Sequence, residues 1–90
     1  MTGRLQDKIV FVMGAGARGQ GWSNGKAASV LFAREGARVF AVDISADAAA
    51  ETRYIIRSEG GEAESFVADA TDSGSVKTAI DACIASYGGI

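Results

Sequence analysis

The sequence predicts an α/β protein in which a parallel sheet lies between helices, in three layers. Segments with the apolar pattern of strands alternate three times with segments of helical periodicity, glycines mark most boundaries, and no proline occurs among the 90 residues. Three successive β-α units imply right-handed crossovers and helices on both faces of the sheet. We therefore expect one incomplete unit over residues 1–90, part of a doubly wound sheet with strand order 3-2-1.

The first β-α unit combines a buried strand, a loop of small residues and a helix. Residues 8–13 contain a continuous apolar run, which is typical of a parallel strand buried on both faces. Residues 14–24 are rich in Gly, Ala, Ser and Asn and indicate a loop. A helix is expected over residues 25–35, with Asn24 as its N-cap and Gly36 as its left-handed end.

The second unit has the same order. Residues 38–43 are rich in β-branched and aromatic side chains, which predicts a strand. Ser45 can cap a helix over residues 46–59, and Gly60-Gly61 ends it. The buried face of this helix is predicted to comprise Ala48, Thr52, Ile55 and Ile56.

The third unit completes the pattern. A strand is expected over residues 64–68, and Asp72 can cap a helix that Gly88-Gly89 closes. The apolar face of that helix is predicted to comprise Val76, Ile80, Cys83, Ile84 and Tyr87. Within such a face we interpret Cys83 as a small apolar filler rather than a reactive thiol.

Composition argues against several classes of function. The net charge is −2 and the basic residues are scattered, so nothing attracts nucleic acid or an anionic membrane. A single cysteine cannot form an internal disulfide, and the absence of histidine removes the commonest metal ligand and general base. The apolar run 9–13 is too short to span a bilayer. We expect a cytoplasmic protein without a metal site.

The loop between the first strand and the first helix is the most informative segment. From Gly14 to Gly25 it reads GAGARGQGWSNG. Glycine permits a sharp turn after a buried strand and leaves the backbone bare, so that a pyrophosphate can approach it. The amides and the dipole at the start of the helix attract the phosphate charge. This context predicts a Rossmann dinucleotide site, with a flexible connection that binds nothing as the alternative.

The spacing of the loop glycines departs from the usual motif. Gly14, Gly16 and Gly19 match Gly-x-Gly-x-x-Gly, but the helical pattern begins several residues later. We therefore expect Gly14 to make the first turn and Gly25 to pack the helix against the strand. Gly19 and Gly21 would line an enlarged phosphate loop.

The second strand ends in Asp43, 18 residues after Gly25. A carboxylate there can accept hydrogen bonds from both hydroxyls of the adenosine ribose and would repel a 2′-phosphate, which favours NAD over NADP. Ile44 follows it on the adenosine side. Arg18 argues the other way, because a basic loop residue can pair with a 2′-phosphate. Asp43 could also simply cap a turn.

Asp69 and Ala70 follow the third strand. Ligands of open α/β sheets lie beyond the carboxyl ends of the strands, so Asp69 is placed to accept from the adenine amino group, beside the Ala70 backbone. The alternative is an acidic loop residue or an additional cap. Trp22, inside the loop, could cover the cofactor or pack on the first helix, and packing is favoured.

Several segments are similar to the amino-terminal part of the short-chain dehydrogenase/reductase family: KIVFVMG, the glycine-rich loop, LFAREGARV, VDI and ADATD. The resemblance covers Leu5 to Ile90. Met13 stands where the family commonly has Thr, and the longer loop resembles a divergent branch. The resemblance implies cofactor binding by Gly14, Gly19, Gly21, Gly25, Asp43 and Asp69.

The family's catalytic residues have no counterpart among these 90 residues. The resemblance implies a fourth strand, an Asn-Asn-Ala-Gly motif, a catalytic Ser and a Tyr-x-x-x-Lys pair that exchanges the proton. Here no tyrosine is followed four residues later by lysine. We therefore assign no catalytic residue. We expect the NAD-binding segment of an oxidoreductase that moves hydride between NAD(H) and an alcohol or ketone, with weak adenosine-side binding and no turnover by this chain.

Two other interpretations stay open. One is a half-domain of another nucleotide-binding enzyme, such as a methyltransferase or a nucleotide-sugar enzyme. The other is a self-associating module without ligand. If no fourth strand lies beside residues 9–13, one apolar edge is open, and such edges recruit other strands. We therefore expect a homo-oligomer through this edge, or attachment of a carboxyl-terminal half.

Overall fold

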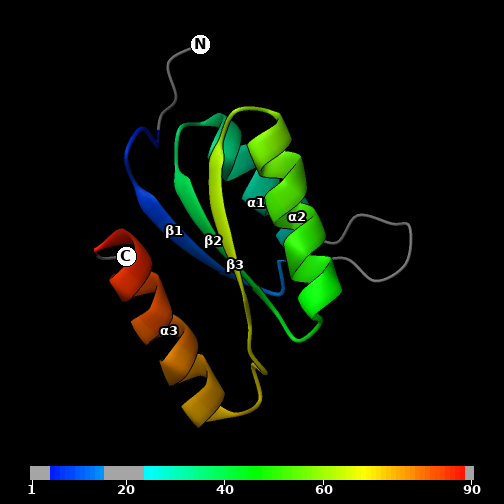
Figure 1. Ribbon diagram of the computed structural model, residues 1–90, viewed down its shortest axis with the longest axis vertical. Helices are drawn as coiled ribbons and strands as arrows, with labels where there is room; N and C mark the ends of the chain where they lie inside the picture. The colour runs from blue at the N-terminus through cyan, green and yellow to red at the C-terminus, as the bar shows by residue number, and fades with distance from the viewer. Residues whose placement is uncertain (1–4, 16–23, 89–90) are drawn as a thin grey trace.

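The computed structural model describes residues 5–15 and 24–88, and within these ranges three parallel strands lie between helices. The elements are, in chain order, β1 (Ile9–Met13), α1 (Asn24–Arg34), β2 (Arg38–Asp43), α2 (Ala46–Ser58), β3 (Glu62–Val67) and α3 (Ser73–Tyr87). β2 pairs with β1 on one side and β3 on the other, which is the predicted order 3-2-1. Figure 1 shows α1 and α2 on one face of the sheet and α3 on the other, so the three-layer prediction is confirmed.

The core lies on both faces of β2, because successive side chains of a strand point to opposite faces. Val39 and Ala41 face α1 and α2 and belong to one apolar cluster. Phe40 and Val42 belong to the cluster beneath α3, with Ala79, Cys83 and Ala68. Burial raises the pKa of the Cys83 thiol, as expected for an apolar filler.

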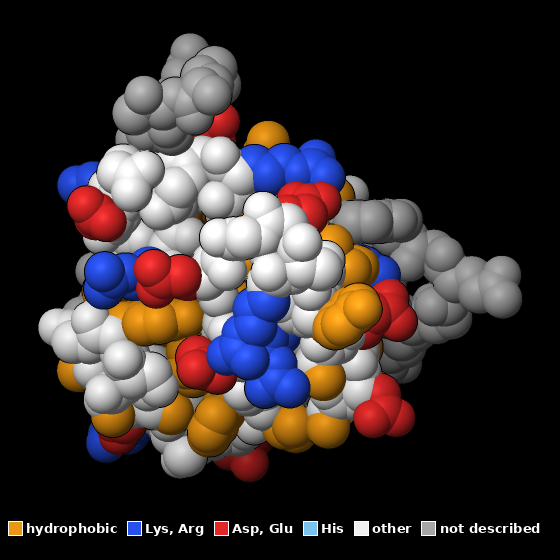
Figure 2. Space-filling model, turned by 45° about the horizontal axis from the view of Figure 1, so that its top comes forward, with side chains coloured by type: hydrophobic (Ala, Val, Ile, Leu, Met, Phe, Trp, Pro, Cys, Tyr) orange, Lys and Arg blue, Asp and Glu red, His pale blue; other side chains and the backbone are white. Residues whose placement is uncertain are grey.

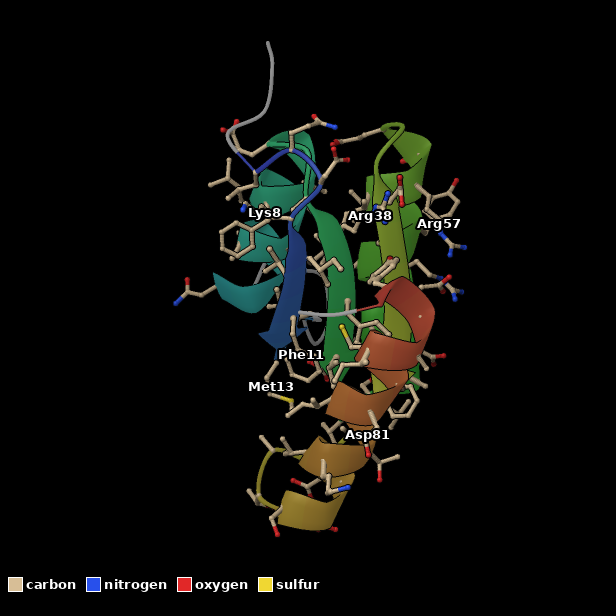
Figure 3. All side chains as sticks on the ribbon, turned by 90° about the vertical axis from the view of Figure 1, so that its left-hand side faces the viewer. Lys8, Phe11, Met13, Arg38, Arg57 and Asp81 are labelled. Atoms are coloured by element: carbon tan, nitrogen blue, oxygen red, sulfur yellow. The ribbon has the colours of Figure 1, made fainter. Side chains whose placement is uncertain are left out.

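Both faces of the first strand contact the core, as predicted, but within the described part of the chain its residues are less buried than expected. All five residues of β1 are only partly buried, whereas every residue of β2 after Arg38 is buried. β1 lies at an edge of the described sheet and pairs there with β2 alone. Phe11 and Met13, labelled in Figure 3, extend from β1 toward the cluster beneath α3.

Aromatic rings organise the face beneath α3. The Phe40 ring lies 6.0 Å from that of Phe11, 5.9 Å from that of Phe66 and 6.3 Å from that of Tyr87, measured between centroids. The Tyr87 hydroxyl donates to the Val39 carbonyl at 3.2 Å. The end of α3 is thereby fixed beside the amino half of β2.

Most helix ends follow the predicted capping residues. The Ser45 Oγ accepts from the Ala48 amide at 3.2 Å, and Asp72 accepts from two amides in the first turn of α3. The predicted left-handed glycines have positive φ: Gly36 at 94°, Gly60 at 88° and Gly88 at 84°. Asn24 is an exception, since it lies inside α1 rather than capping it. No helix in the described ranges has the length and apolar character needed to cross a membrane.

The start of β3 and one helix face differ from the prediction. β3 begins at Glu62, two residues earlier than expected, because its ladder with β2 starts at the register pair of Arg38 and Glu62. Exposed ion pairs accompany this register, Glu62 with Arg38 at 3.3 Å and Glu64 with Arg57 at 3.1 Å. On α3 the buried residues are Ala79 and Cys83, and Ile84, which was predicted to face the core, is 46% exposed.

Candidate functional site

The carboxyl edge of the sheet brings together those predicted site residues that the structure describes, since all three strands run in the same direction. Asp43 is the register partner of Val67, and the ladder continues beyond the strands. The Ala15 amide donates to the Val42 carbonyl at 2.9 Å, and the Ala68 amide donates to the Asp43 carbonyl at 3.1 Å. The segments that follow β1, β2 and β3 therefore leave the sheet side by side.

Gly14 and Gly25 lie in direct backbone contact, which sets where α1 starts. Gly14 has φ +75° and makes the turn after β1. A Cβ on Gly25 would lie 1.9 Å from the Gly14 carbonyl oxygen and 3.3 Å from the Ala15 α-carbon. Only glycine permits this approach, so the helix-packing role predicted for Gly25 is confirmed. The first turn of α1 lies against the carboxyl end of β1.

Asp43 is held firmly at the end of β2. The residue is 8% exposed, and its Oδ1 accepts from the Ser45 amide at 2.9 Å. The alternative role as a turn cap is therefore present. This hydrogen bond fixes the carboxylate between β2 and α2 and uses the Oδ1 atom, so it does not conflict with binding a ribose. Ile44, the next residue, is 52% exposed.

Asp69 also caps a local turn. Its Oδ1 accepts from the Thr71 amide at 2.9 Å and from the Thr71 hydroxyl at 2.7 Å. These hydrogen bonds, led by that of the hydroxyl, hold the pKa of the Asp69 carboxyl below its usual range. The Asp69 amide in turn donates to the Ser75 Oγ at 2.9 Å, and Ala70 beside it is exposed. The alternative role of Asp69 as a capping residue is thus confirmed.

Sequence reasoning missed Val67 as a candidate site residue. Val67 ends β3 and is 50% exposed, and it lies in register with Asp43. With Ile44 it gives the carboxyl edge two half-exposed apolar side chains around a carboxylate. An apolar residue at the end of a strand could have indicated this role. Because the third strand was predicted to end at residue 68, Val67 was not recognised as its last residue.

Several predicted residues lie outside the described ranges. Gly16, Gly19 and Gly21, assigned to the phosphate loop, belong to this group, as do Arg18 and Trp22. Among the described residues, no group of three or more acidic, cysteine or histidine side chains could hold a metal ion.

The hollow at the amino edge of the sheet is not the candidate site. It is lined by the turns that precede β2 and β3, including Gly36 and Gly61, and by the first residues of these strands, Arg38 and Glu62. Parallel α/β sheets bind ligands at the opposite, carboxyl edge. Arg38 and Glu62 form an ion pair at this edge, and Figure 2 shows basic and acidic side chains next to one another on the surface it presents.

Comparison with known proteins identifies the family. The sequence profile described as short chain dehydrogenase matches residues 8–90. The chain belongs to the short chain dehydrogenase family. Enzymes of this family are oxidoreductases that use NAD(P) cofactors. The match favours this interpretation over a methyltransferase half-domain.

Individual members of the short chain dehydrogenase family are similar to this chain over most of its length. YxbG of Bacillus subtilis, an uncharacterised oxidoreductase, is 43% identical over 79 residues, which cover 88% of this chain and 27% of the relative. LinX of Sphingobium indicum, a 2,5-dichloro-2,5-cyclohexadiene-1,4-diol dehydrogenase, is 36% identical over 90 residues, covering 100% and 34%. A 7α-hydroxysteroid dehydrogenase, solved with NADH and 7-oxo glycochenodeoxycholic acid, superposes with a TM-score of 0.87 at 34% identity, covering 94% and 31%. The chain thus spans about a third of the length of these relatives.

Proposed function

We propose that this chain forms the adenosine-diphosphate half of the NAD(H) site of a short-chain dehydrogenase. The observation that carries the proposal is the contact of Gly25 with Gly14, where a Cβ would come within 1.9 Å of the carbonyl oxygen. This contact brings the first turn of α1 to the carboxyl end of β1, near the end of β2. Donor amides, a positive helix end and a carboxylate are the groups that a dinucleotide requires.

The described residues fit an adenine dinucleotide part by part. The amides at the start of α1 would hold the diphosphate, and Asp43 would accept hydrogen bonds from the ribose hydroxyls. Ile44 and Val67, both about half exposed, would contact the faces of the adenine ring, with Asp69 near its amino group. When bound, NAD supplies the atom that accepts or donates hydride.

The fixed carboxylate supports NAD over NADP. Asp43 is buried against its own turn and one of its oxygens accepts from the Ser45 amide, so it cannot swing away from a 2′-phosphate without losing that hydrogen bond. The Asp43 carboxylate and a 2′-phosphate bound beside it would both be negative, and such charges repel each other strongly where water is partly excluded. We infer that the ribose with a free 2′-hydroxyl is preferred.

The proposed reaction of the whole enzyme is transfer of hydride between NAD(H) and an alcohol or ketone. The similarity to diol and hydroxysteroid dehydrogenases supports this class of substrate. These 90 residues contain no tyrosine followed four residues later by lysine, and hence no acid/base pair of the kind that the family resemblance implies. We therefore expect this chain to bind the cofactor without turnover.

Calorimetric titration of the chain with NAD and NADP tests the proposal. We expect NAD to bind more tightly, and Asp43→Asn to weaken NAD binding about tenfold, or about 1.4 kcal/mol. Asparagine keeps an oxygen for the Ser45 amide, so the turn is preserved. Asp47→Asn is the matched control, because Asp47 is an exposed acid in the first turn of α2. Equal affinity for NAD in the two variants, or tighter binding of NADP by the unmodified chain, would contradict the proposal.

A further inference from the structure

Two consecutive residues of α2 hold the described residues on both sides of the segment 16–23. Thr52 is fully buried, and its hydroxyl donates to the Ala15 carbonyl at 2.9 Å. Glu51 forms an ion pair with Lys26, which is 4% exposed and lies in the first turn of α1. One turn of α2 thus contacts the residue that enters the glycine-rich loop and a residue that follows it.

Neither contact is an ordinary feature of helix packing. The Thr52 hydroxyl also lies 3.3 Å from the Ala48 carbonyl, so it has a local partner within α2 and contacts Ala15 in addition. Lys26 places a buried cation at the positive end of the α1 dipole, where cations are unfavourable, and the first turn of α1 contains no acid. Glu51 offsets this charge from the neighbouring helix.

A second ion pair joins the same helices at their other end. Arg34 of α1 and Glu59, the C-cap residue of α2, meet through two hydrogen bonds of 3.0 and 2.8 Å. Both pairs link residues 25 positions apart, so they correspond in the two helices. The Arg34–Glu59 pair is exposed, with side chains 60% and 38% accessible, and it lies away from the loop. The Arg34–Glu59 pair therefore serves as a control for the Lys26–Glu51 pair, because it also joins the two helices but does so away from the loop.

We propose that Lys26, Glu51 and Thr52 are positioning residues that hold Ala15 and the first turn of α1 in the arrangement that binds the diphosphate. The inference rests on the proposed function. It assigns α2 a task in cofactor binding although α2 is not itself part of the phosphate loop. Thr52 fixes Ala15, which follows the turn at Gly14. The Lys26–Glu51 pair fixes α1 immediately after Gly25.

The test compares four variants of the full chain. Thr52→Val removes the hydroxyl at nearly constant volume, Thr52→Ser restores it, and Glu51→Gln removes the charge that faces Lys26. Arg34→Gln breaks the distal pair. The dissociation constant for NAD is measured by calorimetry, the stability by thermal unfolding, and the exchange rate of the Ala15 amide by NMR without ligand.

We expect Thr52→Val and Glu51→Gln to raise the dissociation constant about tenfold, as when a tenth of the molecules keep Ala15 and the start of α1 in the binding arrangement. Thr52→Ser should bind as the unmodified chain does. Arg34→Gln should lower the melting temperature without changing NAD affinity. The Ala15 amide, which donates to the Val42 carbonyl, should exchange faster in Thr52→Val than in Arg34→Gln.

The outcomes separate this inference from the proposed function. An unmodified chain that binds neither NAD nor NADP refutes the proposed function, and the positioning role with it. An unmodified chain that binds NAD, with unchanged affinity in Thr52→Val and Glu51→Gln, refutes the positioning role alone. Arg34→Gln weakening NAD binding as much as Glu51→Gln, or Thr52→Ser failing to restore it, would reduce the contacts to general stabilisation.

Discussion

Replacing Gly25 with alanine tests the contact on which the candidate site depends. Gly25 lies in the first turn of α1, and an added Cβ would lie 1.9 Å from the Gly14 carbonyl oxygen and 2.7 Å from its carbon. Both atoms belong to the backbone, so no side chain can rotate away. Either α1 moves or the turn after β1 opens.

The size of the effect follows from two opposing contributions. Carbon and oxygen atoms in close contact lie about 3.3 Å apart, so α1 and the turn at Gly14 must separate by about 1.4 Å. Forcing atoms into a packed site costs typically 1–3 kcal/mol and occasionally more, and backbone contact places Gly25→Ala near the upper end. Alanine regains about 1 kcal/mol through helix propensity. We expect the free energy of unfolding to fall by about 2 kcal/mol, from a total of roughly 5–13 kcal/mol for a domain of this size.

Urea denaturation followed by far-UV circular dichroism measures the stability, and NAD calorimetry measures the site. Gly88→Ala is the control. Gly88 ends α3 with φ +84°, and a Cβ added there would meet open space. Gly88→Ala should therefore lower the free energy of unfolding by about 1–2 kcal/mol through backbone strain and leave NAD affinity unchanged. Gly25→Ala should abolish measurable binding. A Gly25→Ala chain as stable as the unmodified one, with NAD affinity intact, would refute the close approach of α1 to β1.

Two further predictions concern other parts of the molecule. Burial, helped by the charges of Glu64 and Glu62, raises the pKa of Tyr87 from its usual value near 10 to about 12. The raised pKa means that the folded state favours the neutral hydroxyl. The contribution of Tyr87 to the free energy of unfolding is therefore complete below pH 10 and is lost as pH rises from about 10 through 12. For a partly buried group that water still screens we expect about 1 kcal/mol, and the urea midpoint of Tyr87→Phe should fall less between pH 9 and 11.5 than that of the unmodified chain. The chain is also expected to self-associate through the β1 edge, which has no partner strand among the described residues. Sedimentation should show dimers or larger species, and a monomer at high concentration would count against this.

Local chemistry made much of the fold predictable from the sequence. The strands were recognisable from short apolar segments, and Ser45 and Asp72 cap helices as their positions suggested. The errors arose where tertiary neighbours decide the outcome. The start of β3 depends on Arg38 facing Glu62 across the sheet, and the exposure of Ile84 depends on how α3 lies over the aromatic cluster.

The candidate site was less predictable because its decisive contacts join distant parts of the chain. Thr52 was recognisable as part of a buried helix face, but its hydrogen bond to Ala15 spans 37 residues and has no sequence signature. Likewise, the acids Asp43 and Asp69 could be placed at strand ends, while their capping of Ser45 and Thr71 required the path of the backbone.

The glycines show why spacing motifs alone cannot assign these roles. In the usual pattern the third glycine packs the helix against the strand, and here Gly19 occupies that place in the motif. The observed contact belongs to Gly25, because α1 begins at Asn24 and the residue in its first turn faces the Gly14 carbonyl. The packing requirement is tied to the start of the helix and moves with it when the loop is longer. Counting from the helix backward, rather than from the strand forward, therefore identifies the residue that must lack a side chain.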